Sequence, residues 1–471
     1  MRTRETPNKW FTFSVVAVGV FMSTLDGSIV NIALPAIMAD LQAPLATIEW
    51  VMLIYLLTIS SLLLSFGRLS DIRGRRWVYT RGLLVFSVGS LFCGLAREAG
   101  WLIAARAFQG LGAAMIMSCT QAIVVETFPA SERGRAMGMI GAVVASGLTV
   151  GPALGGVILH VFNWQTIFYI NIPIGVLTAT AAAMLLRGSP SDQPRPERFD
   201  AAGAFLLALS TGTFLYVVTH GYKDGYASPT ILILAGVAVL SAAGLIWEEF
   251  HVDHPIISPS LLKIRLFVLP VAAAMILFAG LFTIVFMMPF YLMHPRGFSE
   301  NQAGYLMMTL FAFLFVFAPI SGTLSDKIGS RMLCTLGMAI VTLSLYLLSN
   351  ITPTLSSLSI AWRLALAGAG TALFTAPNNA AAMGAAPARF MGIAAGTVAT
   401  VRNLGMVLGI ALAGTIFNVV FFHQSGGVLF KEYRPEYEPV FMAAFRYAMR
   451  AGAVVSGIGI VVSFMRGPDA P

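Results

Sequence analysis

Charged residues are scarce in this chain. Of its 471 residues only 11% are charged, whereas 57% are hydrophobic. An ordinary soluble domain carries about 25% charged residues, so this deficit predicts an integral membrane protein. The net charge of +8 does not indicate a nucleic-acid partner, because the basic residues lie between apolar runs rather than together on one face.

Cysteines and enzyme motifs are equally sparse. The three cysteines, Cys93, Cys119 and Cys334, lie in apolar segments. Their odd number, without paired spacing, excludes a disulfide framework and a cysteine metal site. The chain has no HExxH motif, no phosphate-binding P-loop and no GxSxG motif with partner residues. We therefore expect no metal, no cofactor and no enzymatic activity.

Long hydrophobic runs, by contrast, are abundant. Runs of roughly 18 or more apolar residues are typical of membrane-spanning helices, and this chain has fourteen of them. They lie at 11–38, 46–67, 77–97, 100–125, 135–159, 166–186, 201–220, 230–247, 267–293, 300–324, 331–350, 356–384, 390–421 and 440–465. The first run has about 28 residues, too many for the apolar region of a signal peptide, so we expect an uncleaved first helix. The fold class is thus an all-α integral membrane protein.

A polar, proline-rich segment at 187–200 separates the first six runs from the rest. Such a segment cannot span a bilayer and is typical of a linker. The runs are then arranged as six, two and six. We predict an N-terminal six-helix bundle at 1–186, a linker with two additional transmembrane helices at 187–266, and a C-terminal six-helix bundle at 267–471.

Lysine and arginine are distributed unequally between alternate loops. The loops on one side, which include both termini, hold 18 of these residues, and the loops on the other side hold five. Cytoplasmic loops carry the excess of basic residues in membrane proteins. We therefore expect both termini in the cytoplasm, as an even number of spans also requires.

One motif occurs twice. GRLSDIRGRR at 67–76 returns as GTLSDKIGSR at 322–331, with six of ten positions identical. Each copy follows the second run of a six-run block. Repeated halves with a substrate site between them are the construction of secondary transporters.

Five motifs together resemble those of the major facilitator superfamily, specifically its fourteen-helix drug/proton antiporter branch. The motif at 67–76 is similar to the signature of the loop after the second helix. Four further segments resemble the signatures of helices 1, 4, 5 and 6. In that order they are LDGSIVNIALP at 25–35, LIAARAFQGLGAAMI at 102–116, GLTVGPALGG at 147–156 and NWQTIFYINIPIG at 163–175. The resemblance covers nearly the whole chain. It implies two six-helix bundles of the major facilitator type plus two extra linker helices.

The resemblance also implies a cytoplasmic gate after the second helix. Asp71 is expected to close this gate by docking on the N-terminus of another helix, where a carboxylate is stabilised. A solvated charge cluster is the alternative, but it does not explain an acid that recurs in both repeats, as Asp71 and Asp326. The expected gate residues are Gly67, Asp71, Arg75, Glu126, Arg135 and Asp326.

Glycines recur every fourth residue in the fifth run. Gly147, Gly151 and Gly155 therefore share one helix face, and Pro152 interrupts the backbone ladder beside them. Small residues at this spacing let two transmembrane helices approach closely. The resemblance implies an antiporter helix that seals the interface between the halves, and tight packing alone is the alternative.

Asp26 is the only ionisable side chain of the first run. An acid in the middle of a spanning helix costs about 3 kcal/mol on insertion scales. Low dielectric favours the neutral form of a carboxyl group, so we predict that Asp26 carries a proton. The resemblance places Arg106 near this proton site, where its charge would oppose that effect. The alternatives are an acid bonded to Ser23, Thr24 or Asn31, and an arginine bonded to backbone carbonyls.

Four side chains are expected in the substrate cavity: Asn31, Phe282, Phe286 and Asn378. Phenylalanines and methionines are frequent between 267 and 324, and they form adaptable apolar surfaces, although packing or lipid contact is the alternative. The interiors of the second-half helices carry no acid, which disfavours recognition of multivalent cations.

These features predict a secondary active transporter of the bacterial inner membrane. It exchanges protons for lipophilic neutral or monocationic small molecules such as drugs, and it acts as a monomer in the lipid bilayer without a nucleic-acid partner. A proton-coupled exporter of a specific metabolite or lipid is the alternative. A passive channel and an intramembrane enzyme fit the motifs less well.

Overall fold

The computed structural model describes residues 9–129, 132–186, 201–251, 261, 263–387 and 391–466. Inside these ranges the side chains of Asp71, Asp326 and some other residues are not described. The predicted linker at 187–200 also lies outside the described residues. Every regular element in the described ranges is helical, as the sequence predicts.

The first half of the chain comprises α1 (Lys9–Asp40), α2 (Leu45–Ile48), α3 (Trp50–Arg73), α4 (Arg75–Gly94), α5 (Ala99–Thr127), α6 (Arg133–Val161), α7 (Thr166–Tyr169) and α8 (Asn171–Leu185). Two helices follow, α9 (Ala201–Asp224) and α10 (Pro229–His251). The second half comprises α12 (Arg265–Met293), α13 (Glu300–Ile328), α14 (Ser330–Ser349), α15 (Ser357–Ala385), α16 (Met391–Gln424), η4 (Phe430–Glu432), η5 (Pro435–Tyr437) and α17 (Glu438–Phe464).

Each of the fourteen predicted runs coincides with one of these helices or with a pair of consecutive helices. Thirteen of the described helices are long and apolar enough to cross a membrane. The apolar part of α9, Phe205–Gly221, is shorter. The chain is therefore an all-helical, multi-pass membrane protein with thirteen candidate spans in its described part.

The repeated motif folds in the same way in both copies. In the first copy, Gly74 separates α3 from α4 with a φ of 90°, and in the second, Gly329 separates α13 from α14 with a φ of 81°. These positive φ angles are easily adopted by glycine and rarely by other residues. The shared glycine thus sets the sharp turn between the second and third helices of each block.

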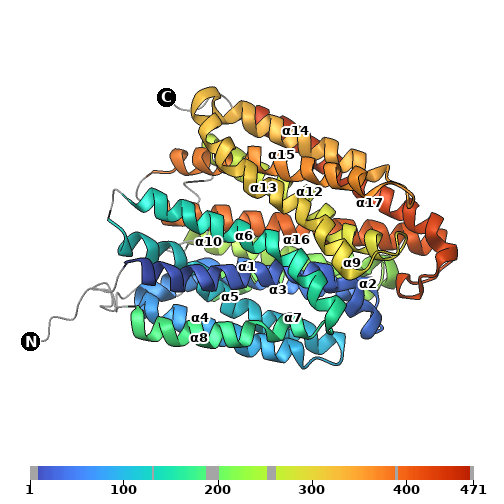
Figure 1. The fold of residues 1–471 in the computed structure, drawn as a ribbon, viewed down its shortest axis with the longest axis horizontal. Coiled ribbons are helices and arrows are strands. Elements are labelled where there is room, and N and C mark those ends of the chain that lie inside the picture. The colour runs from blue at the N-terminus through green and yellow to red at the C-terminus, as the bar shows by residue number, and fades with distance from the viewer. Residues whose placement is uncertain are drawn as a thin grey trace, which may run out of the picture.

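The two blocks also pack in the same pattern. In the first block α1 packs on α6 and α4 on α5, and in the second α12 packs on α16 and α14 on α15 (Figure 1). The blocks meet where α6 crosses α13 and where α3 crosses α16. Helix α9 contacts both α3 and α16, and α10 packs on α9. The additional pair therefore lies beside the junction of the two blocks.

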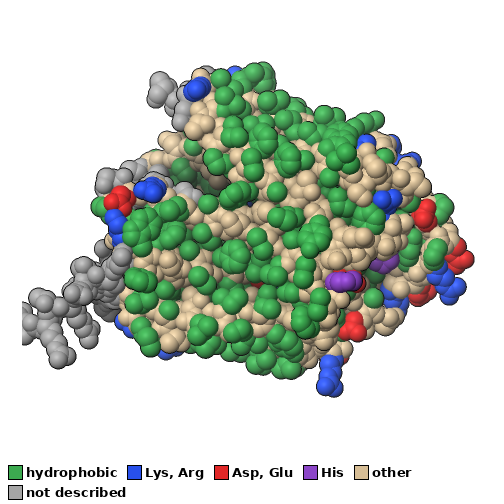
Figure 2. Space-filling view, viewed as in Figure 1, with side chains coloured by type: hydrophobic (Ala, Val, Ile, Leu, Met, Phe, Trp, Pro, Cys, Tyr) green, Lys and Arg blue, Asp and Glu red, His purple; other side chains and the backbone are tan. Residues whose placement is uncertain are grey.

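The helix ends define two ends of the molecule. Helix α1 begins and α17 ends at the same end, which we call the terminal end; α1 ends and α3 begins at the opposite, distal end (Figure 1). On the face in Figure 2, hydrophobic side chains spread over the middle and charged side chains gather toward the two ends. This distribution matches a protein whose middle lies in the hydrocarbon core of a bilayer.

Candidate functional site

Asp26 and Arg106 meet inside the first block. Arg106 Nη1 on α5 donates to Asp26 Oδ2 on α1 at 2.5 Å. The Asp26 side chain is 0% exposed and the Arg106 side chain is 1% exposed. Buried charges inside a membrane protein face partners or cavities, and here each charge is the partner of the other. The structure thus brings together the two residues that were predicted for proton coupling.

Two amides complete the shell of the carboxylate. Gln109 Nε2 on α5 and Asn171 Nδ2 on α8 each donate to Asp26 Oδ1 at 2.9 Å. Gln109 also donates to Ser90 Oγ on α4 at 2.8 Å. Helices α5 and α8 therefore converge on one carboxyl group of α1, and α4 supports the amide of Gln109. Three donors, one of them charged, form a site that suits an ionised carboxylate.

Arg106 has acceptors besides Asp26. Its Nη1 donates to Gln109 Oε1 at 2.6 Å, and its Nε donates to the carbonyl of Val51 on α3 at 3.0 Å. Its guanidinium lies over the ring of Tyr55 with Cζ 4.0 Å from the ring centroid, a cation–π geometry. The guanidinium is therefore bonded to α3 and α5 in addition to the carboxylate.

The hydroxyl groups near Asp26 in sequence bond elsewhere. Ser23 Oγ and Thr24 Oγ1 both donate to the carbonyl of Val20, at 3.0 and 2.8 Å, and no hydrogen bond joins Asn31 to Asp26 among the described contacts. The sequence left open a structural alternative in which Asp26 bonds to Ser23, Thr24 or Asn31. These three residues are not the hydrogen-bond partners of Asp26, so this alternative is wrong. The actual partners come from α5 and α8.

The residues that were predicted for the gate lie at the terminal end. Arg75, at the start of α4, forms an ion pair with Glu126 at the end of α5 and donates to the carbonyl of Ala122 at 3.2 Å. Arg135 is exposed at the start of α6, and Gly67 has open space beside its Cα. Asp71 and Asp326 lie in the last turns of α3 and α13, and their side chains are outside the described part. Their role in the gate remains a prediction.

The glycine face of α6 packs on α1 of the same block. Gly147, Gly151 and Gly155 approach α1 so closely that a methyl group at any of them would collide with that helix. Ser28 Oγ on α1 also donates to the carbonyl of Gly147 at 3.1 Å. In the second block, Gly405 approaches α12 from α16 in the same way. The motif thus fixes a helix pair within each block.

Contact between the blocks is made beside this glycine face. Gly304 on α13 lies against the carbonyl of Pro152, and Gly156 lies against the backbone of Glu300. His160 Nδ1 is 4.0 Å from Glu300 Oε2 across the same junction. These residues belong to the end of α6 and the start of α13, so they join the blocks at the distal end.

The four residues predicted for the substrate cavity are all buried. Asn378 Nδ2 donates to the carbonyl of Pro270 at 3.0 Å, which ties α15 to α12. Phe286 packs on Phe290 with ring centroids 5.6 Å apart, and Phe282 belongs to the same core. The side-chain oxygens of Asn31 and Asn378 have no hydrogen-bond partner among the described residues. Their assignment to a cavity remains a prediction.

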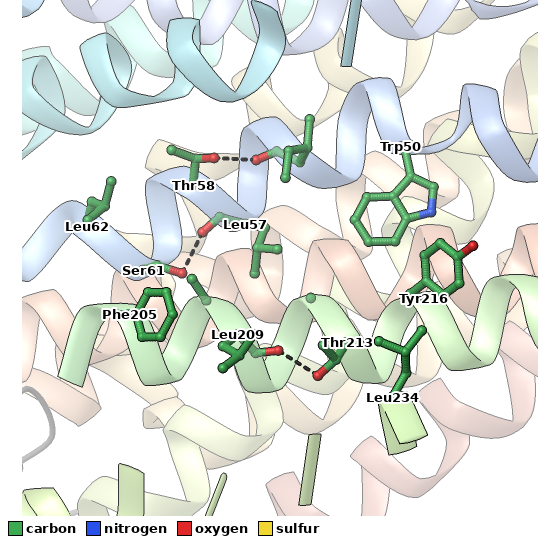
Figure 3. Close-up of a pocket in the computed structure, with 13 residues that line it drawn as sticks. Trp50, Leu57, Thr58, Ser61, Leu62, Phe205, Leu209, Thr213, Tyr216 and Leu234 are labelled. Carbon is green, nitrogen blue, oxygen red and sulfur yellow. Dashed lines mark hydrogen bonds between the residues drawn. The ribbon is translucent and has the colours of Figure 1, made fainter. Parts of the chain in front are cut away.

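A cavity of about 660 Å³ lies elsewhere, between α3 and α9 (Figure 3). Trp50, Leu57, Phe205 and Tyr216 are among the side chains that line it. Hydroxyl groups in the lining are turned back to their own helices, as Thr213 Oγ1 is to the carbonyl of Leu209 at 2.6 Å. The surface that it offers is therefore mainly apolar, and Asp26 is not part of it.

Two further charged residues have buried polar atoms in the described part of the chain. Glu49, just before α3, is 0% exposed, and neither of its carboxylate oxygens has a hydrogen-bond partner among the described residues. Arg402 on α16 is half-buried, with its Cζ 5.9 Å from the centroid of the Phe278 ring. Its Nε has no hydrogen-bond partner in the described part. Position in the sequence concealed Glu49, because it stands close to the start of its predicted run.

The fold and the site define a class of protein. Two helical blocks with repeated packing, and a buried ion pair within one of them, are the features of a membrane transporter built from structural repeats. The profile of the Major Facilitator Superfamily matches residues 16–410 and 271–470. The chain belongs to this superfamily and is a non-enzymatic transporter.

Its similarity to individual proteins extends over most of the chain. It is 33% identical over 463 residues to the riboflavin transporter RibZ of Clostridioides difficile, with 98% of each chain covered. It is 31% identical over 406 residues to the multidrug resistance protein Stp of Mycobacterium tuberculosis, with 86% of this chain and 75% of that protein covered. The fold resembles that of a bacterial homologue of the human lysosomal transporter Spinster in an inward-facing, unoccupied conformation. The TM-score is 0.71 at 16% identity, with 97% of this chain and 96% of that chain covered.

Proposed function

We propose that this transporter is a proton-coupled antiporter that exports lipophilic neutral or monocationic small molecules, drugs among them, from the cytoplasm across the bacterial plasma membrane. The observation that carries the proposal is the fully buried pair of Asp26 and Arg106. Ionisable residues inside membrane spans mark proton relays and ion pathways. This pair is the arrangement that proton binding can break and restore.

The proton step involves no covalent chemistry. A proton on Asp26 removes the charge that faces Arg106, and Arg106 keeps its hydrogen bonds to Gln109 and to the carbonyl of Val51. The ion pair joins α1 to α5, so its loss loosens the contact between these two helices. Proton binding therefore favours a different arrangement of the first block, which is what coupling to alternating access requires.

The membrane topology follows from helix count and charge. Helix α9 extends for 24 residues, or about 36 Å at 1.5 Å per residue, which exceeds the roughly 30 Å of a hydrocarbon core. Counting it as a span gives fourteen spans, and the excess of basic residues then assigns both termini to the cytoplasm. The terminal end is cytoplasmic and the distal end is extracellular.

This topology also assigns a conformation. Contacts of Pro152 with Gly304 and of Gly156 with Glu300 hold the blocks together at the distal end. In this topology these contacts close the extracellular side, as an inward-facing state requires. A passive channel would not need such a closure, which supports a carrier that opens to one side at a time.

The interior charges favour neutral substrates over cations. The negative charge of Asp26 is matched by the positive charge of Arg106, and Arg402 adds a half-buried positive charge in the second block. The unpartnered side-chain oxygens of Asn31 and Asn378 can accept hydrogen bonds. A lipophilic molecule with a few polar N–H or O–H groups fits these features better than a multivalent cation does.

The alternative is a proton-coupled exporter of one metabolite or lipid on the same scaffold. One observation favours it: the relative that aligns over 98% of both chains is named a riboflavin transporter. Relatives named multidrug resistance proteins favour the broader substrate range. The same assay can separate the two.

The test is efflux from proteoliposomes that contain the purified protein. We expect saturable transport of several lipophilic neutral dyes, driven by an imposed pH gradient and accompanied by opposite proton movement. Transport of riboflavin alone, or of another single metabolite, would support the alternative. Flux that neither saturates nor responds to the pH gradient would contradict both.

A further inference from the structure

Glu49 is an acid that the coupling step at Asp26 does not use. It lies between α2 and α3 at the distal end, and its side chain does not cap α3. Its side chain is fully buried, and both carboxylate oxygens lack hydrogen-bond partners among the described residues. A charged carboxylate without partners is very costly in such a place, whereas a neutral acid is tolerated.

The second block closes over this carboxyl group. Gly414 on α16 faces Glu49 so closely that a methyl group there would collide with Oε2. The ring of Phe286 on α12 lies beside the same spot. Glu49 is therefore buried by the contact between the two blocks, and it is dehydrated only as long as the distal end stays closed.

Among the described side chains, no charged group faces Glu49 from the helices packed around it. Gly414 and Phe286 are the neighbours on α16 and α12. Beyond them, the nearest titratable side chain on α16 is His423, more than two helical turns away, and on α12 it is the phenol of Tyr291, five residues from Phe286, followed by His294. On α3 itself the next titratable side chain is that of Tyr55.

The other two helices near this site contribute no charge at Glu49 either. On α9, Thr219 Oγ1 accepts from Trp50 Nε1 at 3.3 Å, with His220 beside it. On α1, Asp40 accepts from Trp164 Nε1 at 2.7 Å. The contacts of the described residues thus leave the carboxyl group of Glu49 to be neutralised by a proton.

We propose that Glu49 is a second proton-binding site, and that its proton closes the distal end of the transporter. With the proton bound, α16 packs over a neutral acid. When the proton leaves, the ionised carboxylate requires water, and the separation of α3 from α16 provides it. Proton release at Glu49 thus opens the end of the molecule at which it lies.

The site is also linked to Asp26 through the backbone. Val51, two residues after Glu49, accepts a hydrogen bond from Arg106 Nε at 3.0 Å. A movement of the first turn of α3 away from α16 changes this contact, and Arg106 is the ion-pair partner of Asp26. This consequence rests on the proposed antiport. In an antiporter, a proton taken up by Glu49 from the acidic exterior would return the carrier to its inward-facing state.

The proton site itself can be tested without substrate or gradient. Spin labels at Arg97→Cys and Leu358→Cys report the separation of the two blocks at the distal end, since 97 precedes α5 and 358 begins α15. Both positions are exposed, and the three native cysteines are buried. His160→Gln and Glu300→Gln belong in the background, because these two residues form a titratable contact across the same junction.

Electron–electron distances are measured in nanodiscs between about pH 5 and about pH 9, a range that covers the titration of buried carboxyl groups. We expect the population with long distances to rise by up to about tenfold per pH unit, the limit for one proton. Glu49→Gln should keep the distal end closed at every pH, and Glu49→Asp, which retains an acid, should restore the response.

Two results would overturn the proposal: distances that do not change with pH in the parent protein, or an unchanged pH response in Glu49→Gln. The outcome is independent of the antiport itself. A protein with the expected distance changes but without gradient-driven efflux would retain the Glu49 site and refute the proposed function. A protein with gradient-driven efflux but without the expected distance changes would retain the proposed function and refute the Glu49 site.

Discussion

Arg106 and Gln109 lie three residues apart on α5 and hold the two oxygens of one carboxylate. Arg106 Nη1 is 2.5 Å from Asp26 Oδ2, and Gln109 Nε2 is 2.9 Å from Asp26 Oδ1. Residues at this spacing share a helix face, so one turn of α5 presents a charge and an amide to the same group on α1. A single proton at Asp26 therefore acts on both contacts.

The Asp26→Asn variant should lose efflux driven by a pH gradient while remaining folded. Asparagine keeps the shape of the side chain and lowers the insertion cost, but its amide does not exchange a proton in the accessible pH range. Efflux should fall to the leak rate of empty vesicles, and binding of an uncharged substrate should persist without pH dependence. The measurement is substrate efflux with proton movement followed in the same vesicles.

Asp40→Asn is the matched control for this change. Asp40 is the other acid of α1, and the oxygen that accepts from Trp164 Nε1 is retained in asparagine. This variant should transport like the parent protein. If Asp26→Asn retained full gradient-driven efflux, the coupling site would lie elsewhere, with Glu126 and Glu49 the next acids to examine.

The spans of this protein could be predicted because bilayer thickness fixes their length. The glycine turn in the repeated motif likewise follows from local sequence. The shell around Asp26 could not be predicted in the same way. Asn171 and Ser90 are ordinary polar residues in apolar helices, and only the packing of α8 and α4 on α1 and α5 brings them together. The spacing of Gln109 after Arg106 was the one available signal.

Glu49 escaped notice for a different reason. It lies near the start of a predicted run, where an acid is ordinarily in contact with water or lipid headgroups. The structure shows that α2 already precedes it and that Gly414, far away in the sequence, covers it. Burial by the opposite block depends on tertiary structure, and no local pattern in one sequence reports it.

The side-chain amides of Gln109 and Asn171 should contribute unequally to positioning the carboxylate of Asp26. Gln109→Leu removes hydrogen bonds to Asp26, Ser90 and Arg106, whereas Asn171→Leu removes one bond to Asp26. A hydrogen bond to a charged group contributes about 1.5–3 kcal/mol, so we expect a roughly tenfold to hundredfold loss of efflux rate for Gln109→Leu and a smaller loss for Asn171→Leu.

A readout beyond the rate distinguishes positioning from mere structure. Both variants remove donors from the carboxylate, so the pH profile of efflux should move toward higher pH. The measurement is the initial efflux rate at a fixed gradient over a series of absolute pH values. A lower rate with an unshifted profile would mean that the amides support the fold and not the proton site.

Asp71→Asn should lower transport while expression persists. The expectation rests on an acid that recurs as Asp326 in the second copy of the motif, beside the ion pair of Arg75 with Glu126 at the same end. Asp326→Asn should have a smaller effect, because its loop contains fewer arginines. Initial rates in proteoliposomes, normalised to the protein content, measure both. Equal rates for Asp71→Asn and the parent would identify Asp71 as one surface charge among several.

Acid should weaken the distal aromatic cluster around His294. Burial lowers the pKa of His294 from its usual value near 6.5, and the carbonyl of Phe290, 3.2 Å from Nδ1, opposes the effect in part. Its ring centroid is 5.1 Å from that of Phe430 and 5.3 Å from that of Tyr433. At pH values between the lowered pKa of His294 in the folded protein and its usual pKa in the unfolded chain, the unfolded chain binds more protons. The free energy of unfolding therefore falls as the pH drops below about 6.5.

The melting temperature of the purified protein measures this effect. His294→Phe, which keeps a ring in the cluster, should lose less stability than the parent protein between about pH 7 and about pH 5, where histidine titrates. His251→Phe is the control, because His251 is exposed on α10 and should leave the pH dependence as it is. Parallel curves for the parent and for His294→Phe would contradict the prediction.

Arg402 should set the charge preference of the transporter. The Arg402 side chain is half-buried, its Nε has no hydrogen-bond partner among the described residues, and its Cζ lies 5.9 Å from the centroid of the Phe278 ring on α12. Two unit charges about 8 Å apart interact by roughly 2 kcal/mol at an effective dielectric constant of 20, so a substrate cation in the interior is opposed by about this amount. Arg402→Gln removes the opposition and should raise the efflux of a monocationic dye roughly thirtyfold relative to a neutral dye of similar size. Arg402→Lys keeps the charge and should keep the preference of the parent protein.

The measurement is the ratio of the two efflux rates in the same vesicles, which cancels differences in protein amount and folding. An equal ratio in all three proteins would show that Arg402 lies outside the path of the substrate, and the preference for neutral molecules would then have to come from the Asp26 site alone.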